Sequence, residues 1–147
     1  MTNAKSTTKR DHQVILIAED DPDDRLMIAD AFKENRHGSR IRFAGSGEEV
    51  LEFLHGEPRD MPALIMLDLN MPRLDGRSLL KILKTDPETE NIPVVVLTTS
   101  KAGTDRTSVH ELGAAGFFTK PSSFTELVGI TSSILHKWLP DNTQTKN

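Results

Sequence analysis

Short apolar runs alternate with longer amphipathic stretches along most of the chain. The apolar runs cover residues 14–18, 41–44, 63–67, 94–97 and 116–118. Runs this short and this uniformly apolar are typical of β-strands that are buried on both faces, as in a parallel sheet covered by helices. The run at 41–44 is the least apolar of them, which suits an edge strand. The pattern therefore predicts five strands of one parallel sheet.

Each apolar run is followed by a stretch with helical periodicity. The predicted helices cover residues 22–35, 47–55, 75–85, 104–112 and 124–138. The last has a continuous apolar face and ends before Pro140, whereas the fourth has only Val109 and Leu112 to bury. Five β-α units in succession predict an α/β fold, a flavodoxin-like (βα)5 doubly wound sheet with helices on both faces.

Polar side chains follow four of the predicted strands directly. They are Glu19 and Asp20 after the first strand, Asp68 and Asn70 after the third, Thr98 after the fourth and Lys120 after the fifth. The common strand order for five strands is 2-1-3-4-5, in which the first and third strands are neighbours. Ligands of open α/β sheets bind outside the carboxyl ends of the strands, so we expect these side chains to converge on one crevice.

An acidic segment with two different explanations follows the first strand. Asp21 before Pro22 is typical of a helix N-cap followed by proline at the first helical position. Asp23 and Asp24 then lie in the first turn, where the helix dipole favours acidic residues. Helix initiation accounts for these three acids, and we do not assign them to the site. It does not account for Glu19 and its neighbour Asp20, which precede the cap.

The remaining carboxylates predict a metal and a phosphoryl group. Glu19 and Asp20 facing Asp68 would repel one another unless a cation lies between them, and oxygen ligands in an open site suit Mg²⁺. Aspartate is a known covalent acceptor of phosphoryl groups. A phosphoryl group on Asp68 would need an ammonium and a hydrogen-bond donor, which Lys120 and Thr98 supply.

Composition narrows the range of functions. The chain has 147 residues, enough for one domain with its own core, which we place at residues 13–139 between polar tails at 1–12 and 140–147 that we expect to be disordered. A net charge of −4 without a basic stripe argues against a nucleic-acid partner, and the absence of cysteine excludes disulfides and thiolate metal sites. No signal peptide or apolar stretch of membrane-spanning length is present, so we expect a cytoplasmic protein with no membrane partner.

Four motifs together resemble the receiver domain of bacterial two-component response regulators. They are ILIAEDD at 15–21, LDLNMP at 67–72 followed by Asp75-Gly76, LTTS at 97–100 and GAAGFFTKP at 113–121. Their order and spacing match that family over about residues 13–139. The resemblance implies that Asp68 is the phosphoacceptor. It also implies that Asp20 binds Mg²⁺ directly, Glu19 mainly through water and Asn70 through its backbone carbonyl.

The same resemblance implies a switch and its partners. Thr98 and Lys120 would contact the phosphoryl group, and Phe117 occupies the switch-aromatic position, which is often tyrosine in the family. The change would be relayed to the face made by the fourth helix, the fifth strand and the fifth helix. A sensor histidine kinase would donate the phosphoryl group, and a histidine phosphotransfer protein is a further expected partner. The protein would be no enzyme beyond its own phosphorylation and slow dephosphorylation.

Several segments suggest a narrower group. Residues 21–24, 57–62 and 86–93 and the ending Trp138-Leu139 are similar to regulators that partner cyanobacterial phytochromes. This similarity implies a bacteriophytochrome as the kinase and a homodimer. Because no output domain follows, we expect a single-domain response regulator.

Two alternatives compete with this interpretation. A pseudo-receiver could serve as an interaction scaffold without phosphorylation, but the complete set of predicted site residues speaks against it. A Mg²⁺-dependent hydrolase of the haloacid-dehalogenase type also uses an aspartate nucleophile. That class normally has a second aspartate two residues later, where this chain has Asn70, and no substrate cap is recognisable.

Overall fold

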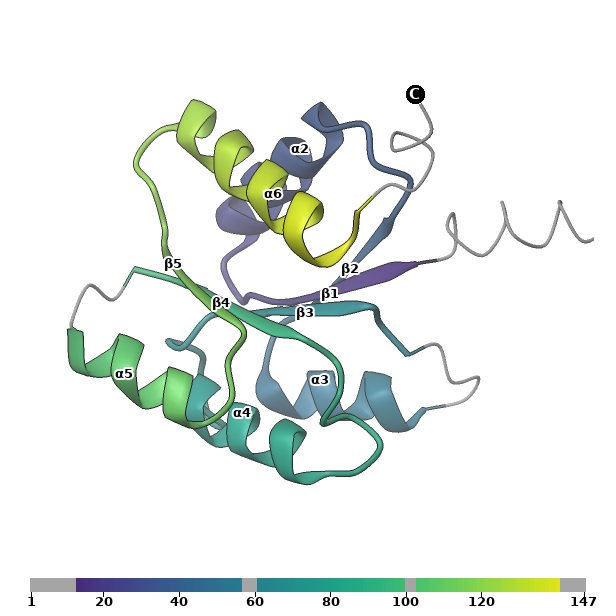
Figure 1. Cartoon of the computed structure of the whole chain (residues 1–147), viewed down its shortest axis with the longest axis vertical. Helices are drawn as coiled ribbons and strands as arrows, with labels where there is room; N and C mark the ends of the chain where they lie inside the picture. The colour runs from purple at the N-terminus through teal and green to yellow at the C-terminus, as the bar shows by residue number, and fades with distance from the viewer. Residues whose placement is uncertain (1–12, 57–60, 100–102, 141–147) are drawn as a thin grey trace, which may run out of the picture.

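A computed structural model describes residues 13–56, 61–99 and 103–140, and it shows the predicted alternation of strands and helices (Figure 1). The strands are β1 (Val14–Ala18), β2 (Arg40–Ala44), β3 (Leu64–Leu67), β4 (Val94–Thr98) and β5 (Gly116–Thr119). The helices are α2 (Pro22–Glu34), α3 (Gly47–His55), α4 (Gly76–Thr85), α5 (Gly103–Glu111) and α6 (Phe124–Trp138). Each predicted boundary is met within one residue. The predicted tails lie outside the described residues except for Pro140.

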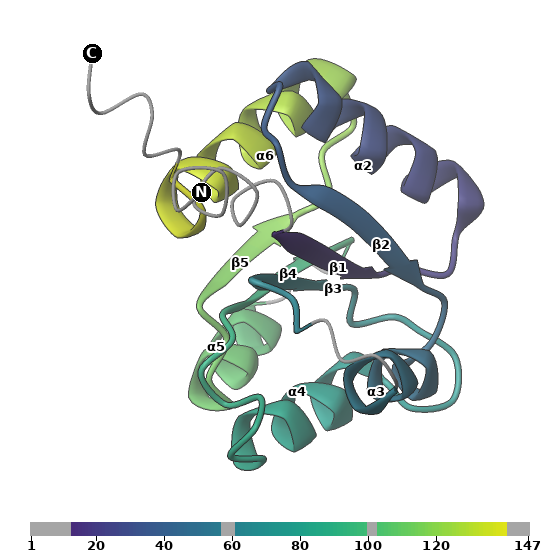
Figure 2. The same ribbon diagram turned by 90° about the vertical axis from the view of Figure 1, so that its right-hand side faces the viewer.

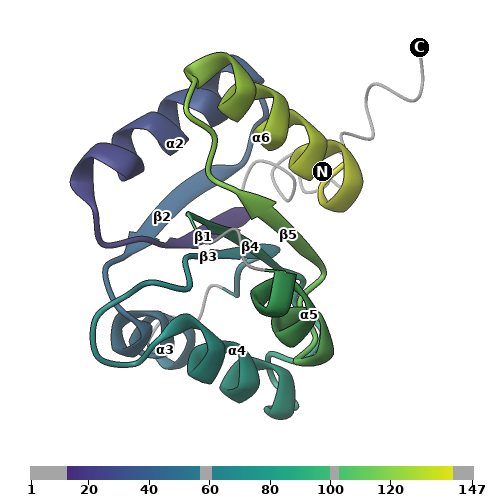
Figure 3. The same ribbon diagram turned by 90° about the vertical axis from the view of Figure 1, so that its left-hand side faces the viewer.

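The strands form one parallel sheet in the order β2-β1-β3-β4-β5, which confirms the predicted flavodoxin-like topology. Helices α2 and α6 cover one face of the sheet, and α3, α4 and α5 cover the other (Figure 1). The views from either side show the same layers (Figures 2 and 3). Because β1 and β3 are neighbours, the loops that follow them lie side by side.

Two apolar cores, one on each face, explain why the strands are uniformly apolar. Ile15 and Ile17 of β1 pack in the core beneath α2 and α6, whereas Leu16 and Ala18 pack in the core beneath the other three helices. Alternate residues of a strand point to opposite faces, so a strand covered on both sides has no position left for a polar residue. The edge strand β2 is only partly buried, as its weaker apolar pattern predicts.

Side-chain caps start the helices at the edge of the sheet where the strands end. Asp21 accepts hydrogen bonds from the backbone N–H groups of Asp23 at 2.8 Å and Asp24 at 3.4 Å, which confirms it as the N-cap of α2. Asp75 caps α4 by accepting from the N–H of Ser78 at 2.9 Å. Such caps satisfy backbone N–H groups that have no partner within the helix. None of the helices in the described part of the chain combines the length and the apolarity needed to cross a bilayer.

Replacing Asp75 with alanine should destabilise the protein by about 1 kcal/mol at pH 7, because the first turn of α4 loses its cap. The backbone hydrogen bond from Ser78 lowers the pKa of Asp75 from its ordinary value of 3.8. A lowered pKa in the folded state stabilises the fold above the unfolded-state pKa, and this contribution is lost as the pH falls through the folded-state value. The difference between the two proteins should therefore shrink in acid.

Urea unfolding at several pH values measures this difference. Asp30→Ala is the control, because Asp30 is an exposed acid of α2 that caps no helix. Its effect should stay within about 0.5 kcal/mol. A difference for Asp75→Ala that did not depend on pH would contradict the role of the ionised carboxylate.

Candidate functional site

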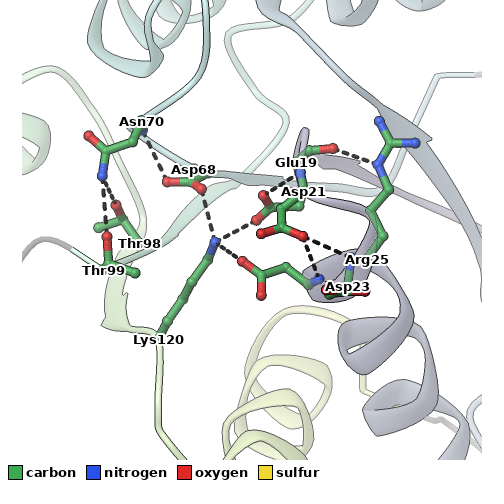
Figure 4. A network of polar contacts seen from close by, with 10 residues as sticks. Glu19, Asp21, Asp23, Arg25, Asp68, Asn70, Thr98, Thr99 and Lys120 are labelled. Atoms are coloured by element: carbon green, nitrogen blue, oxygen red, sulfur yellow. Dashed lines mark hydrogen bonds and ion pairs between the residues drawn. The ribbon is translucent and has the colours of Figure 1, made fainter.

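Most of the predicted site residues converge at the carboxyl edge of the sheet, where Figure 4 shows Glu19, Asp68, Asn70, Thr98 and Lys120. Carboxylate oxygens of Glu19, Asp20 and Asp68 lie within 4.8 Å of one another, although the first two follow β1 and the third follows β3. Lys120, which follows β5, extends its side chain into the same group (Figure 4). The structure thus brings together side chains that follow three different strands.

Lys120 is the centre of the polar network. Its ammonium donates to Glu19 Oε1 at 2.7 Å, Asp24 Oδ2 at 2.7 Å and Asp68 Oδ2 at 3.0 Å. Burial alone would lower the pKa of Lys120, but hydrogen bonds to the three carboxylates and the charge of Asp68 outweigh burial and raise it. Lysine has three N–H donors, so each of its protons has a carboxylate partner in this arrangement.

Glu19 is an almost fully buried carboxylate with a fixed position. It is only 2% exposed, and burial raises its pKa although the hydrogen bond from Lys120 acts in the opposite direction. Its Oε2 accepts from the N–H of Asp21 at 3.1 Å. Arg25 donates from Nε to the backbone carbonyl of Glu19 at 2.6 Å. The guanidinium carbon of Arg25 lies 5.5 Å from the ring centroid of Phe43. The arginine therefore anchors the backbone at the end of β1.

Asp68 is held by both of its carboxylate oxygens. Oδ1 accepts from the N–H of Asn70 at 3.0 Å, and Oδ2 accepts from Lys120. The residue is 6% exposed, and its own N–H donates to the carbonyl of Ala18 at 3.2 Å. These contacts fix the carboxylate in a defined orientation next to the other two acids.

The loop after Asp68 passes so close to the start of α4 that position 76 has no room for a side chain. The N–H of Gly76 donates to the carbonyl of Leu69 at 3.2 Å. A Cβ atom on Gly76 would lie 2.6 Å from Leu69 Cα and 2.8 Å from the carbonyl oxygen of Asp68. Because both neighbours are backbone atoms that cannot easily move, glycine is required here, which explains the Asp75-Gly76 pair in the sequence.

Asn70 connects the loops that follow β3 and β4. Its Nδ2 donates to Thr99 Oγ1 at 3.3 Å and lies 3.5 Å from Thr98 Oγ1 (Figure 4). Thr98 is fully buried at the end of β4. The sequence predicted only a backbone contribution from Asn70, so the bridge made by its side chain is an addition.

Phe117 lies next to a cavity on the face formed by α5 and β5. The guanidinium carbon of Arg106 is 4.7 Å from the centroid of the Phe117 ring, within the range of a cation–π contact. Arg106, Val109, His110 and Phe117 contribute to the walls of this cavity of about 390 Å³. The aromatic ring is partly buried and covered by a charged side chain from the neighbouring helix.

Asp24 corrects the sequence interpretation, which assigned it to helix initiation alone. It does lie in the first turn of α2, but its carboxylate also pairs with Lys120. A signal for this contact was available, because side chains in a helix tilt toward its N-terminus and the N-terminus of α2 opens onto the edge where the strands end. Asp21 and Asp23 remain explained by the helix start.

Comparison with known proteins shows the family of the chain. The family model of the response regulator receiver domain matches residues 15–132. The chain is 32% identical over 129 residues to the probable methanogenesis regulatory protein FilR2 of Methanothrix harundinacea, covering 86% of this chain and 83% of that protein. It is 34% identical over 131 residues to response regulator Rcp1 of Synechocystis, covering 86% and 89% respectively.

Solved structures of response regulators have a similar fold. The phosphorylated cyanobacterial phytochrome response regulator RcpA has a TM-score of 0.80 at 32% identity and covers 87% of this chain and 94% of its own. The Mn²⁺-bound form of Rcp1 has a TM-score of 0.77 at 34% identity and covers 86% and 94%. The chain belongs to the response regulator receiver domain family, and its relatives include response regulator Rcp1 and the cyanobacterial phytochrome response regulator RcpA.

Proposed function

We propose that this protein accepts a phosphoryl group on Asp68 from the phosphohistidine of a sensor histidine kinase, with Mg²⁺ bound. The observation that carries the proposal is the Asp68 carboxylate, which is oriented by Asn70 and Lys120 beside two further carboxylates. A buried group of acids with one ammonium is costly for a protein that only provides a scaffold. The same group is suited to binding a cation and a phosphoryl anion together.

The carboxylates of Glu19, Asp20 and Asp68 fit a hard divalent cation, since they are oxygen ligands within 4.8 Å of one another. Asp20 and Asp68 would bind the metal directly, Glu19 mainly through water and Asn70 through its backbone carbonyl. When bound, Mg²⁺ would offset the negative charge of the incoming phosphoryl oxygens. The Mn²⁺-bound form of Rcp1 supports a divalent ion in a relative.

In the transfer step, an oxygen of Asp68 would bond to phosphorus while the bond between phosphorus and the imidazole nitrogen of the donor breaks. The electron pair of that bond stays on the imidazole, so no oxidant or reductant is needed. Lys120 and Thr98 would donate hydrogen bonds to the phosphoryl oxygens and stabilise their charge. Water would later cleave the acyl phosphate and regenerate the carboxylate.

The phosphoryl group would change partner binding through the face made by α5, β5 and α6. Thr98 at the end of β4 and Phe117 in β5 connect the site to this face, because their strands are neighbours in the sheet. RcpA is a cyanobacterial phytochrome response regulator, which favours a bacteriophytochrome as the kinase of this protein. A histidine phosphotransfer protein and a second copy of the chain are the other partners that we propose.

Intact mass spectrometry after incubation with phosphoramidate and Mg²⁺ tests the proposal. We expect a gain in mass of one phosphoryl group, which EDTA prevents and which disappears slowly after the donor is removed. An unchanged mass would favour the scaffold alternative. Sustained multiple turnover of a phosphomonoester would favour the phosphohydrolase alternative.

A further inference from the structure

Asp24 differs from the other two acids that bind Lys120. Its Oδ2 lies as close to the ammonium as Glu19 does, at 2.7 Å. However, the side chain of Asp24 is 35% exposed, whereas those of Glu19 and Asp68 are 2% and 7% exposed. Asp24 also lies outside the group of carboxylates whose oxygens gather within 4.8 Å. It is therefore a partner of the lysine and not a member of the candidate metal cluster.

This difference matters because the ammonium and a metal ion would compete for the same carboxylates. Glu19 and Asp68 each bind Lys120 in this structure, and both belong to the candidate metal cluster. An ammonium bound to them opposes a cation by charge repulsion and by occupying ligand oxygens. Asp24 gives the ammonium an acceptor that the metal does not need.

A phosphoryl group on Asp68 would bind the same ammonium. All three N–H donors of Lys120 are engaged by carboxylates, one of which is Asp68 itself. A phosphoryl group on Asp68 can replace the contact with Asp68, but a second hydrogen bond from the ammonium to the phosphoryl oxygens must displace Glu19 or Asp24. Asp24 is the most exposed of the three acids, so water can solvate its carboxylate when the contact with Lys120 is lost. Losing this contact therefore costs less free energy than losing the contact with Glu19. Asp24 thus stands in competition with the phosphoryl group for Lys120.

We propose that Asp24 is a positioning residue, the counterion of Lys120 that favours Mg²⁺ binding and that competes with the phosphoryl group for the ammonium. The proposal rests on the function proposed above and adds a residue that helix initiation alone had explained. It predicts opposite effects on two ligands. Removing the charge of Asp24 should weaken Mg²⁺ binding and strengthen the binding of a phosphoryl analogue.

The first measurement is the affinity of the unphosphorylated protein for Mg²⁺ by titration calorimetry. We expect Asp24→Asn to raise the dissociation constant about three- to tenfold, as the loss of one partly exposed charge pair implies. Asp23→Asn is the matched control, because it removes the same charge from the same helical turn without a described contact to Lys120. It should change the constant less than about twofold. Asp24→Glu, which keeps the carboxylate, should restore most of the affinity.

The second measurement is the affinity for beryllofluoride, an analogue of a phosphoryl group on a carboxylate, at saturating Mg²⁺. Asp24→Asn should bind it about three- to tenfold more tightly than wild type, whereas Asp23→Asn should not. Equal effects of the two variants on both ligands would overturn the proposal. If wild type bound no beryllofluoride but Mg²⁺ affinity still fell only in Asp24→Asn, phosphoacceptance would fail while the counterion role would stand.

Discussion

Asp68→Asn will abolish uptake of a phosphoryl group from phosphoramidate in the presence of Mg²⁺. The amide has no anionic oxygen to attack phosphorus. The candidate metal cluster also loses one of its three carboxylates, leaving those of Glu19 and Asp20. Intact mass spectrometry measures the result directly. Asp30→Asn, which changes an exposed acid of α2, is the control and should become phosphorylated like wild type.

The Asp68→Asn protein should remain folded, so that its failure cannot be ascribed to unfolding. Asparagine has nearly the same shape, and its side-chain oxygen can still accept from the N–H of Asn70 or from Lys120. Thermal unfolding followed by circular dichroism checks this point. A folded variant that still gained the mass of a phosphoryl group would move the acceptor role to Glu19 or Asp20.

Lys120→Met should destabilise the metal-free protein by about 2–4 kcal/mol at pH 7, the largest loss of stability that we expect from a single substitution in the site. Removing one partner of a buried charge network leaves the other charges without compensation. The partial exposure of Asp24 reduces the loss below that of a fully buried pair. Urea unfolding in EDTA measures the change, and Lys81→Met, an exposed lysine of α4, is the control.

Mg²⁺ should recover part of this stability, because a ligand that binds only the folded state stabilises it. Lowering the pH should also recover part of the stability of the Lys120→Met protein. Burial raises the pKa of Glu19 above its ordinary value of 4.5, so its protonation favours the folded state below that value, and this contribution is lost as the pH rises through the raised pKa. A Lys120→Met protein whose stability was independent of both Mg²⁺ and pH would contradict the charge network.

The strands were predictable because burial on both faces leaves an unusually simple pattern, and their order followed from the common topology of five-stranded open sheets. Ile15 and Leu16 face opposite cores, yet both must be apolar, so the whole run of β1 reads as one uninterrupted apolar segment. Helix α5 was harder, with only Val109 and Leu112 to bury. The structure shows Val109 fully buried and an ion pair from Arg77 to Asp105 that ties α5 to α4, a contact between residues far apart in the sequence.

The site was predictable to the extent that strand ends define it. Glu19, Asp68 and Lys120 each follow a strand directly, so the strand order alone brings them together. Asp24 was missed because a complete local explanation, the first turn of a capped helix, already accounted for it. The cover of Phe117 by Arg106 was missed for a related reason, since it depends on how α5 lies against β5.

The sequence by itself determined the fold, the edge of the sheet that carries the site and most of the residues that reach it, because hydrophobic periodicity follows from local pattern and strand order from general topology. Only the tertiary structure decided how the charges are shared. Lys120 has three donors and several acids within reach, and distances of a few ångströms between different elements select Asp24 as the third partner of its ammonium, alongside Asp68 and Glu19. Such distances are a property of packing, which no single segment of sequence contains.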